Sequence, residues 1–410
     1  MSERLKFFRK LMSAFEGTSN PQRAVERGFY VNLPNNPVSV ITAKIALRPS
    51  SVHLLFGGIG SGKTTQLLLT QQALNELEDI KAIYVDVSLV ADISDLQSGA
   101  LIAIAGIELI TILGYIDDSK LKSCKKIIEN VAYGYKETKV ISSLSESLNT
   151  SLSIIQSMSP REIVTNHKGL LSPEKQENKD QVLQAFSELH KAAREKIERE
   201  IVFLFDGLDR LSDSQVFIDS ALNDIVEIKN AGIGSVLVGS VVTIYKKREN
   251  ITSFDSSSYY LPYLDIFESG EAQNFFADVI TARDGENLIS PEVREFLTFK
   301  SGGVLRDLMS LCQASIEEAY MDGSDRIIKQ HAKQAALSLA RSKIIGLTES
   351  NISILRQVMT EKYFFPRTSE DFELLLTGHI LEYRYPQQRF VVHPILAPII
   401  ESMVVSVTNG

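Results

Sequence analysis

The sequence GGIGSGKTT (residues 57–65) follows the apolar run VHLLF (52–56) and precedes a helical pattern from Gln66 to Leu77. It matches the motif G-x-x-x-x-G-K-[ST] in the strand–loop–helix context that the motif requires. Glycines let the backbone turn tightly and aim its N–H groups inward, so a triphosphate can lie at the positive end of the following helix. The stretch therefore predicts a nucleotide site made by Gly57, Gly58, Ile59, Gly60, Ser61, Gly62, Lys63, Thr64 and Thr65.

Two side chains of this loop have predicted roles in the chemistry. Lys63 would reach the outer phosphates as a point charge, and the hydroxyl of Thr64 would be one ligand of the Mg²⁺ that bridges them.

The composition is that of an ordinary globular protein. The chain has 410 residues, of which 44% are hydrophobic and 23% charged, so it can form two or three domains with a sizeable core. Its net charge of −8 excludes a global positive field for nucleic acid, and any DNA contact would be a local patch. Cys124 and Cys312 have no metal-ligand spacing, and we expect reduced thiols in a cytoplasmic protein.

The apolar stretch GALIAIAGIELITILGYI (99–116) predicts either a buried helix or a membrane span. It is barely long enough to cross a bilayer. Glu108 lies at its middle, where a charge costs about 2.5–3.5 kcal/mol on insertion scales. We therefore expect a buried helix and no membrane association.

Strand and helix patterns alternate after the loop, which indicates parallel crossover units and an α/β fold. Residues 82–87, 201–206 and 234–240 have the continuous apolar character of central strands. Residues 261–267 are expected to form the last strand of the sheet.

The segment between the strands at 82–87 and 201–206 is predicted to contain an insertion. Residues 117–200 are expected to be helical and polar, with an exposed loop from Arg161 to Asp180 and a charged helix from Gln181 to Arg199.

An acidic cluster follows the strand IVFLF (201–205), in the sequence DGLDR (206–210). Ligands of a parallel sheet bind at the carboxyl ends of its strands, so Asp206 is placed to hold Mg²⁺ directly or through water. Asp209 is close enough in sequence to polarise an attacking water or to support the metal shell.

Three further positions are candidate contacts of the nucleotide. Ser240 ends a strand, and its hydroxyl would bond the attacking water or the terminal phosphate, or else cap the next helix. Arg306 lies in the first turn of a helix, where a cation opposes the helix dipole, which favours a contact with the outer phosphate. The segment Phe29-Tyr30-Val31 is a candidate base contact or a buried aromatic pair.

The C-terminal segment predicts helices at 350–359 and 369–376, followed by strands at 380–383 and 389–392, an order typical of a winged helix. Arg384 and Arg389 are candidate contacts of a DNA backbone. The presumptive recognition helix carries Glu370, Asp371 and Glu373, which favours contact with a protein or a second subunit. We expect an N-terminal arm (1–50), a nucleotide-binding core (51–268), a helical lid (269–345) and a winged-helix domain (346–405).

Three motifs together, GGIGSGKTT (57–65), IVFLFDGLDR (201–210) and SGGVLRDL (301–308), resemble the AAA+ superfamily of P-loop ATPases. The similarity is greatest to origin-recognition-type and STAND-like members with a C-terminal winged helix, and it covers about residues 20–400. It implies ATP and Mg²⁺ as ligands and an AAA+ core. It also implies roles for Lys63 and Thr64 (Walker A), Asp206 (Walker B), Ser240 (sensor 1) and Arg306 (sensor 2).

The chain departs from this family at Gly207, where many AAA+ proteins carry a catalytic glutamate. DGLD resembles the STAND and KAP style of Walker B, which implies that Asp209 takes that duty and that hydrolysis is slow. The resemblance implies a homo-oligomeric ATP switch. Its output is either assembly with a separate effector, as in bacterial anti-phage defence, or a changed grip on DNA, as in origin or transposition ATPases. A scaffold that binds ATP with negligible turnover is the third alternative.

Overall fold

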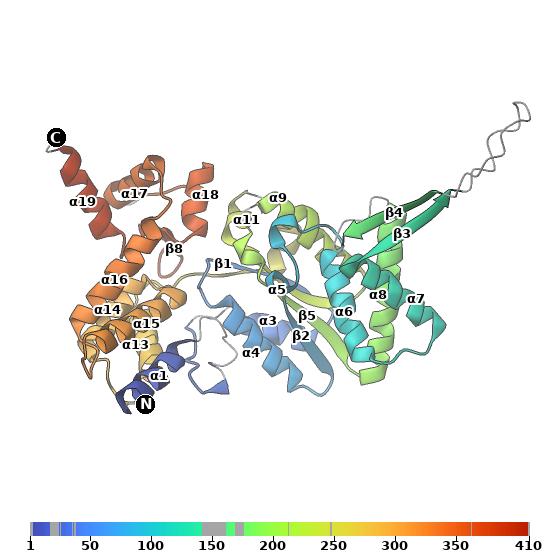
Figure 1. Cartoon of the computed structure of the whole chain (residues 1–410), viewed down its shortest axis with the longest axis horizontal. Helices are drawn as coiled ribbons and strands as arrows, with labels where there is room; N and C mark the ends of the chain where they lie inside the picture. Colours follow the sequence, from blue (N-terminus) through green and yellow to red (C-terminus); the bar gives the residue numbers. More distant parts are fainter. Residues whose placement is uncertain are drawn as a thin grey trace, which may run out of the picture.

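The computed structural model describes residues 3–16, 24, 26–34, 36, 38–141, 161–168, 176–211, 213–246, 248–361 and 363–408. Figure 1 shows the sheet and its helices in the centre and right of the view. Two further groups of helices lie on the left, one above the other.

The core is a parallel five-stranded sheet in the order β2-β5-β6-β1-β7. Its strands in chain order are β1 (Val52–Gly57), β2 (Ile80–Asp86), β5 (Glu200–Asp206), β6 (Gly234–Ser240) and β7 (Ser258–Leu261). Strands β1 and β6 are buried along their whole length, as expected for a sheet covered on both faces. The α/β fold predicted from the sequence, with a parallel P-loop NTPase sheet, is confirmed.

Successive side chains along the strands belong to two separate hydrophobic clusters, one on each face of the sheet. Leu55, Val202 and Val238 pack with α3 (Val38–Leu47) and α4 (Lys63–Asn75). Leu54, Phe203 and Leu237 pack with α6 (Ala100–Leu113), α7 (Ser119–Tyr133) and α8 (Gln176–Ile197). This division follows from the two-residue period of a strand, which points neighbouring side chains to opposite faces.

Short elements complete the core. They are α5 (Val87–Val90), α9 (Ser214–Val216), α10 (Asn223–Asn230), α11 (Val241–Lys246) and α12 (Arg248–Ile251).

The apolar stretch at 99–116 forms the helix α6, most of whose side chains are buried in the core. The fully buried carboxylate of Asp224 accepts hydrogen bonds from the N–H groups of Gly99 and Leu101 and thereby caps the start of α6. Among the described residues, no helix has both the length and the apolar character needed to cross a membrane.

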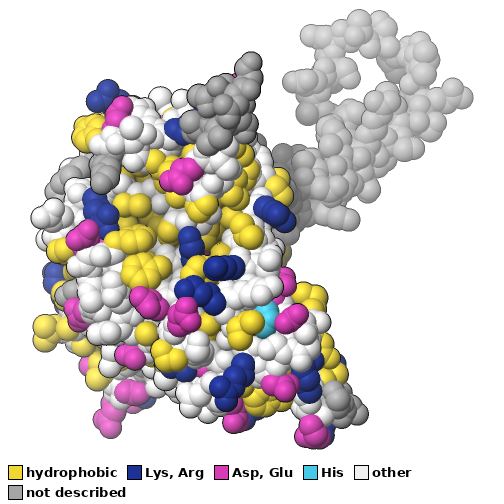
Figure 2. All heavy atoms as spheres, turned by 90° about the vertical axis from the view of Figure 1, so that its left-hand side faces the viewer, with side chains coloured by type: hydrophobic (Ala, Val, Ile, Leu, Met, Phe, Trp, Pro, Cys, Tyr) yellow, Lys and Arg dark blue, Asp and Glu magenta, His cyan; other side chains and the backbone are white. Residues whose placement is uncertain are grey.

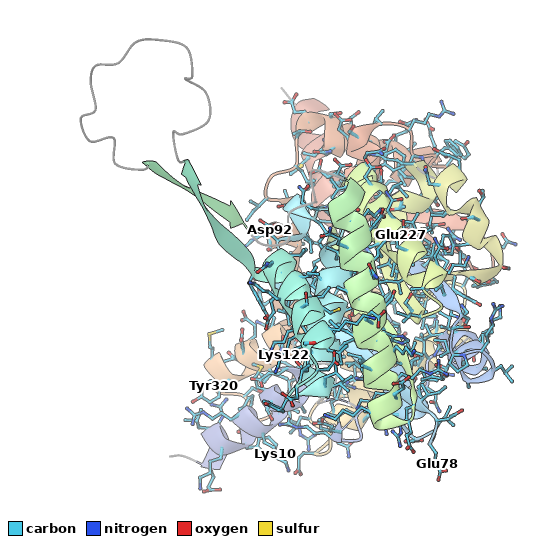
Figure 3. The ribbon with its side chains drawn as sticks, turned by 90° about the vertical axis from the view of Figure 1, so that its right-hand side faces the viewer. Lys10, Glu78, Asp92, Lys122, Glu227 and Tyr320 are labelled. Carbon is cyan, nitrogen blue, oxygen red and sulfur yellow. The ribbon has the colours of Figure 1, made fainter. Side chains whose placement is uncertain are left out.

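The prediction of a helical insertion with an exposed loop from Arg161 missed two strands. Between α7 and α8 the chain forms an antiparallel hairpin of β3 (Gly134–Ile141) and β4 (Arg161–Lys168), so the loop expected from Arg161 begins as a strand. Residues 142–160 and 169–175 lie outside the described residues. Figure 3 shows α7 and α8 side by side and the hairpin leaving from the end of α7. Both strands are rich in polar residues without a regular alternation, and such a strand is specified by pairing with its partner more than by local composition.

The last strand of the sheet also differs from its prediction. β7 ends at Leu261, because Pro262 has no backbone N–H to donate to a neighbouring strand. The chain then makes an isolated bridge between Tyr263 and Tyr383 and leaves the sheet.

The helices after the sheet, called the lid below, form a bundle with α1 (Glu3–Phe15). They are α13 (Gly270–Arg283), α14 (Pro291–Ser301), α15 (Leu305–Met321) and α16 (Lys329–Ile344). Arg4 donates to the carbonyl oxygens of Ala319, Tyr320 and Ser324, which fixes α1 to the end of α15 (Figure 1). The N-terminal segment is thus divided, with α1 on this bundle and α3 on the core.

The C-terminal domain consists of α17 (Glu349–Glu361), α18 (Ser369–Leu376), the hairpin β8 (Ile380–Tyr383) and β9 (Arg389–Val392), and α19 (Ala397–Thr408). Arg389 binds the buried carboxylate of Asp265 through two hydrogen bonds of 2.6 and 2.5 Å. Glu382 accepts a hydrogen bond of 2.9 Å from Tyr260 on β7. The hairpin is therefore docked on the core by charged and polar contacts.

Figure 2 shows the face formed by the lid and the C-terminal domain. Acidic and basic side chains are interspersed on it, and hydrophobic side chains gather in its upper part, which the C-terminal domain forms.

Candidate nucleotide-binding site

The loop between β1 and α4 has the backbone that a phosphate cradle requires. Gly60 and Gly62 have φ angles of +87° and +101°, a region that favours glycine, and Gly62 caps the start of α4. A Cβ at Gly60 would lie 2.9 Å from side-chain atoms of Val304 and Arg306. The loop therefore touches the start of α15 directly.

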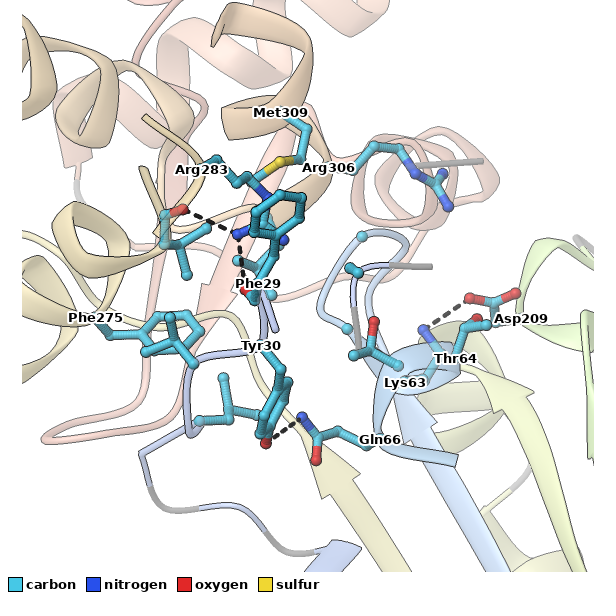
Figure 4. A pocket seen from close by; sticks show the side chains of 18 residues that line it. Phe29, Tyr30, Lys63, Thr64, Gln66, Asp209, Phe275, Arg283, Arg306 and Met309 are labelled. Atoms are coloured by element: carbon cyan, nitrogen blue, oxygen red, sulfur yellow. Dashed lines mark hydrogen bonds and ion pairs between the residues drawn. The ribbon is translucent and has the colours of Figure 1, made fainter. Parts of the chain in front are cut away.

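Lys63 is buried and hydrogen-bonded inside its own loop. Its Nζ donates to the carbonyl oxygens of Gly57 at 3.0 Å and Gly58 at 2.8 Å, and it lies 2.7 Å from Oδ2 of Asp209. Figure 4 shows Asp209 pointing to this ammonium. The ammonium of Lys63 is thus already paired with the carboxylate of Asp209, and an anion bound in the loop would compete with that carboxylate.

Asp206 ends β5 beside the loop, as predicted for the carboxyl end of a central strand. Its carboxylate accepts hydrogen bonds from the N–H of Gly207 at 2.8 Å and from the hydroxyl of Tyr84 at 2.9 Å. Burial raises the pKa of Asp206, against a hydrogen bond from Thr64 that lowers it. Thr64 and Asp206 thus bring a hydroxyl and a carboxylate oxygen together.

These two oxygens are the kind of ligand that Mg²⁺ prefers. Within the described part of the chain, no cluster of three or more His, Cys, Asp or Glu side chains is arranged to hold a metal ion. A Mg²⁺ here would take its remaining ligands from phosphate oxygens and water, as such ions usually do. The residues present fit a Mg²⁺ that arrives with a nucleotide.

The charge of Asp209 is set by opposing effects. Burial alone would raise its pKa, but Lys63, Arg210 and Arg306 together lower it below the ordinary value. Asp209 is therefore ionised at neutral pH, close to the carboxylate of Asp206.

The loop forms one wall of a pocket between the core and the lid (Figure 4). Phe29, Tyr30 and Val31, the candidate base contacts, line it from the N-terminal segment. Arg306 lines it from the lid and extends towards the side that holds Lys63 and Asp209.

Several residues of the pocket were not identified from the sequence. Gln66 donates to the hydroxyl of Tyr30 at 3.4 Å and accepts from the amide of Asn36 at 2.5 Å. Arg283 donates to the carbonyl oxygen of Phe29 at 3.0 Å and lies over its ring, tying the N-terminal segment to α13. Phe275 and Met309 add apolar surface from the lid. Of these residues, only Gln66 had a local signal, because it lies in the first turn of the helix that follows the loop.

Ser240 lies beside Gly57 in the sheet and is buried. Its hydroxyl accepts a hydrogen bond of 3.2 Å from the N–H of Val242, which is the helix-capping alternative. It does not line the pocket in the described structure. By contrast, the buried hydroxyl of Ser61 in the loop has no hydrogen-bond partner among the described residues, and an unsatisfied buried hydroxyl at this place is suited to a phosphate oxygen.

No family model matches the chain, and no curated protein matches it by sequence. Solved structures resemble it at a distance. Cdc6p from Pyrobaculum aerophilum is 12% identical with a TM-score of 0.43, over 95% of this chain and 98% of that one. The Aeropyrum pernix ORC1 protein in complex with DNA is 12% identical with a TM-score of 0.45, over 91% and 94%.

The Thermotoga maritima RuvB Holliday junction branch migration motor is 12% identical with a TM-score of 0.38, over 89% and 92%. Likeness of this degree assigns no ligand, activity or residue role to the present chain.

Proposed function

We propose that this chain is an AAA+ ATPase that acts as a slow molecular switch, with ATP bound between the core and the lid. The observation that carries the proposal is the pocket in which the glycine loop, Asp209 and Arg306 of the lid meet. The apolar lining from Phe275 and Met309 suits a base, and the loop at the other side suits phosphates.

Mg²⁺ would be held by Thr64 and Asp206, and when bound it would supply charge compensation for the phosphate oxygens. Tyr84 would orient the carboxylate of Asp206 through its hydrogen bond. The hydrogen bonds that Asp206 accepts from Thr64 and Tyr84 support this assignment.

Asp209 would serve as the group that accepts a hydrogen bond from the attacking water, because it is ionised and near Asp206. In the structure it is engaged by Lys63. A nucleotide must redirect Lys63 to the phosphates before Asp209 is free, and this step is our reason for proposing slow turnover.

The switch would depend on Arg306. Its side chain lines the pocket from the lid, and its helix begins against Gly60. A contact of Arg306 with the γ-phosphate, absent with ADP, would favour a closed arrangement of lid and core only in the ATP state.

The output would pass through the C-terminal domain, which we propose to be a winged helix that contacts a protein partner or a second copy of the chain. Arg384 and Arg389, the candidate DNA contacts, are both engaged within the molecule. Arg384 is bonded to Glu382 at 2.8 Å, and Arg389 binds Asp265. This pairing favours assembly over DNA binding as the output.

Phosphate release by the full chain, with and without duplex or single-stranded DNA, tests the proposal. The variant Lys63→Met keeps the bulk of the side chain but removes its charge, and Lys122→Met on the exposed face of α7 is the matched control. We expect slow release that Lys63→Met abolishes, Lys122→Met preserves and DNA leaves unchanged. Equal rates in the wild type and Lys63→Met would contradict the ATPase assignment. Stimulation of phosphate release by DNA would contradict a protein partner as the output and favour DNA binding instead.

A further inference from the structure

Four buried side chains from three parts of the chain form a small cluster next to the phosphate loop. They are Tyr263 from the segment after β7, Val304 at the start of α15, and Leu381 and Tyr383 from β8. Tyr263 and Tyr383 also pair through an isolated bridge. The core, the lid and the C-terminal domain therefore meet in this cluster.

Tyr263 contacts the phosphate loop in two ways. Its hydroxyl donates a hydrogen bond of 2.9 Å to the carbonyl oxygen of Ile59. Its ring fills the space that a Cβ at Gly58 would occupy, so the glycine and the ring are matched in shape. Lys63 donates to the carbonyl oxygen of Gly58, and Tyr263 donates to that of Ile59. These two side chains together hold the backbone at residues 58 and 59.

The C-terminal hairpin holds Tyr263 and the lid at the same time. The hydroxyl of Tyr383 donates a hydrogen bond of 2.7 Å to the carbonyl oxygen of Gly302, just before α15. His393 Nε2, after β9, lies 2.9 Å from Oδ2 of Asp307 in the first turn of α15. Arg389 binds Asp265, two residues beyond Tyr263. The hairpin thus spans the junction from the core to the helix that carries Arg306.

We propose that Tyr263 is a positioning residue for the phosphate loop and that hairpin β8–β9 couples its position to the C-terminal domain. This inference rests on the proposed function, because it requires a nucleotide in the loop. A nucleotide that fixes the positions of Ile59 and Arg306 strengthens the docking of the hairpin. A partner that draws the hairpin away weakens nucleotide binding by the same factor, because coupling between two binding events is reciprocal.

The test uses two variants of the full chain that each remove one tyrosine hydroxyl. Tyr263→Phe loses the hydrogen bond to the loop, whereas Tyr260→Phe loses a core-to-hairpin hydrogen bond to Glu382 without touching the loop. We would measure the dissociation constant of a non-hydrolysable ATP analogue and the hydrogen exchange of the hairpin amides, with and without the analogue. Thermal unfolding of both variants controls for a general loss of stability.

We expect Tyr263→Phe to weaken analogue binding about fivefold, the factor that corresponds to one ordinary hydrogen bond. We expect the analogue to slow hairpin exchange in the wild type and in Tyr260→Phe, but much less in Tyr263→Phe. Unchanged affinity in Tyr263→Phe, or hairpin exchange that ignores the analogue in the wild type, would overturn the inference. A wild type that binds no nucleotide at all is a different result, since it defeats the proposed function as well.

Discussion

Lys63 Nζ lies 2.7 Å from Oδ2 of Asp209, and both side chains are largely buried. This ion pair occupies the ammonium that a bound phosphate would need. In the proposed switch it would therefore oppose nucleotide binding and, once broken, free the carboxylate proposed to act in hydrolysis.

The variant Asp209→Asn should bind ATP more tightly and hydrolyse it more slowly. Loss of the partner leaves a buried ammonium uncompensated, which destabilises the nucleotide-free protein by on the order of 3 kcal/mol. A phosphate would relieve that cost. Calorimetry should show a lower dissociation constant for ATP while phosphate release falls at least tenfold.

Asp219→Asn is the control, because this exposed carboxylate is bonded to Gln215 away from the loop. Weaker ATP binding in Asp209→Asn than in this control would contradict the proposed competition.

Tyr84→Phe should lower the rate without changing nucleotide affinity. The hydroxyl of Tyr84 orients Asp206, a candidate Mg²⁺ ligand, but does not line the pocket. Loss of one such hydrogen bond is worth about 1 kcal/mol, or about fivefold in rate. A Mg²⁺ titration of phosphate release should move to higher concentration in Tyr84→Phe.

The matched variant Tyr259→Phe removes a hydroxyl that has no hydrogen-bond partner among the described residues, and its titration should not move. A shift of equal size in both variants would assign the effect to general loosening of the sheet.

Gly303→Ala should lower the free energy of unfolding by disturbing the contact between the lid and the segment that joins it to the core. Gly303 has φ +75°, and a Cβ there would overlap the carbonyl oxygen of Leu264 in the segment between core and lid. Gly323→Ala has the same φ with nothing within 4 Å, so it measures the backbone cost alone, about 1 kcal/mol. Chemical denaturation should show a further loss of about 1–3 kcal/mol for Gly303→Ala, as for other overpacked sites. Equal losses of unfolding free energy in the two variants would mean that the backbone at Leu264 moves aside without a measurable cost.

Stability should depend on pH through Asp224, the buried cap of α6. Burial raises its pKa to about 7, although the N–H groups of Gly99 and Leu101 act to lower it. The folded protein therefore holds this proton more tightly than the unfolded chain. The contribution to stability is complete below about pH 4 and is lost as the pH rises to about 7.

Comparison with Asp224→Asn isolates this group. The difference in unfolding free energy between the wild type and the variant should fall by at most about 1.4 kcal/mol per pH unit between pH 4 and 7. Parallel stability curves over that interval would show that Asp224 does not titrate there.

The parts of the fold that the sequence predicts well are those with strong local constraints. The loop at 57–65 needs glycines at positive φ before a helix, and the strands ending at Asp206 and Ser240 are continuous apolar runs in a covered sheet. The hairpin of β3 and β4 was missed because its residues are mostly polar and pair at long range, from Ile141 with Arg161 to Gly134 with Lys168.

The candidate site shows the same division. Lys63, Thr64 and Asp206 follow from motif and strand, and they lie together in the structure. Tyr84, Tyr263 and Arg283 act across 122, 204 and 254 residues of sequence, respectively. No local pattern distinguishes such residues from ordinary core tyrosines or a surface arginine. The pairing of Lys63 with Asp209 also required the folded chain.

Whether ATP closes the lid on the core through Arg306 can be read from the ratio of the dissociation constants of ADP and a non-hydrolysable ATP analogue. It should be measured in the wild type and in Arg306→Ala under equal Mg²⁺. We predict that the wild type prefers the ATP analogue by about tenfold, as a charge-assisted contact of about 1.4 kcal/mol would give, and that Arg306→Ala loses this preference. An identical ratio in both proteins would contradict it.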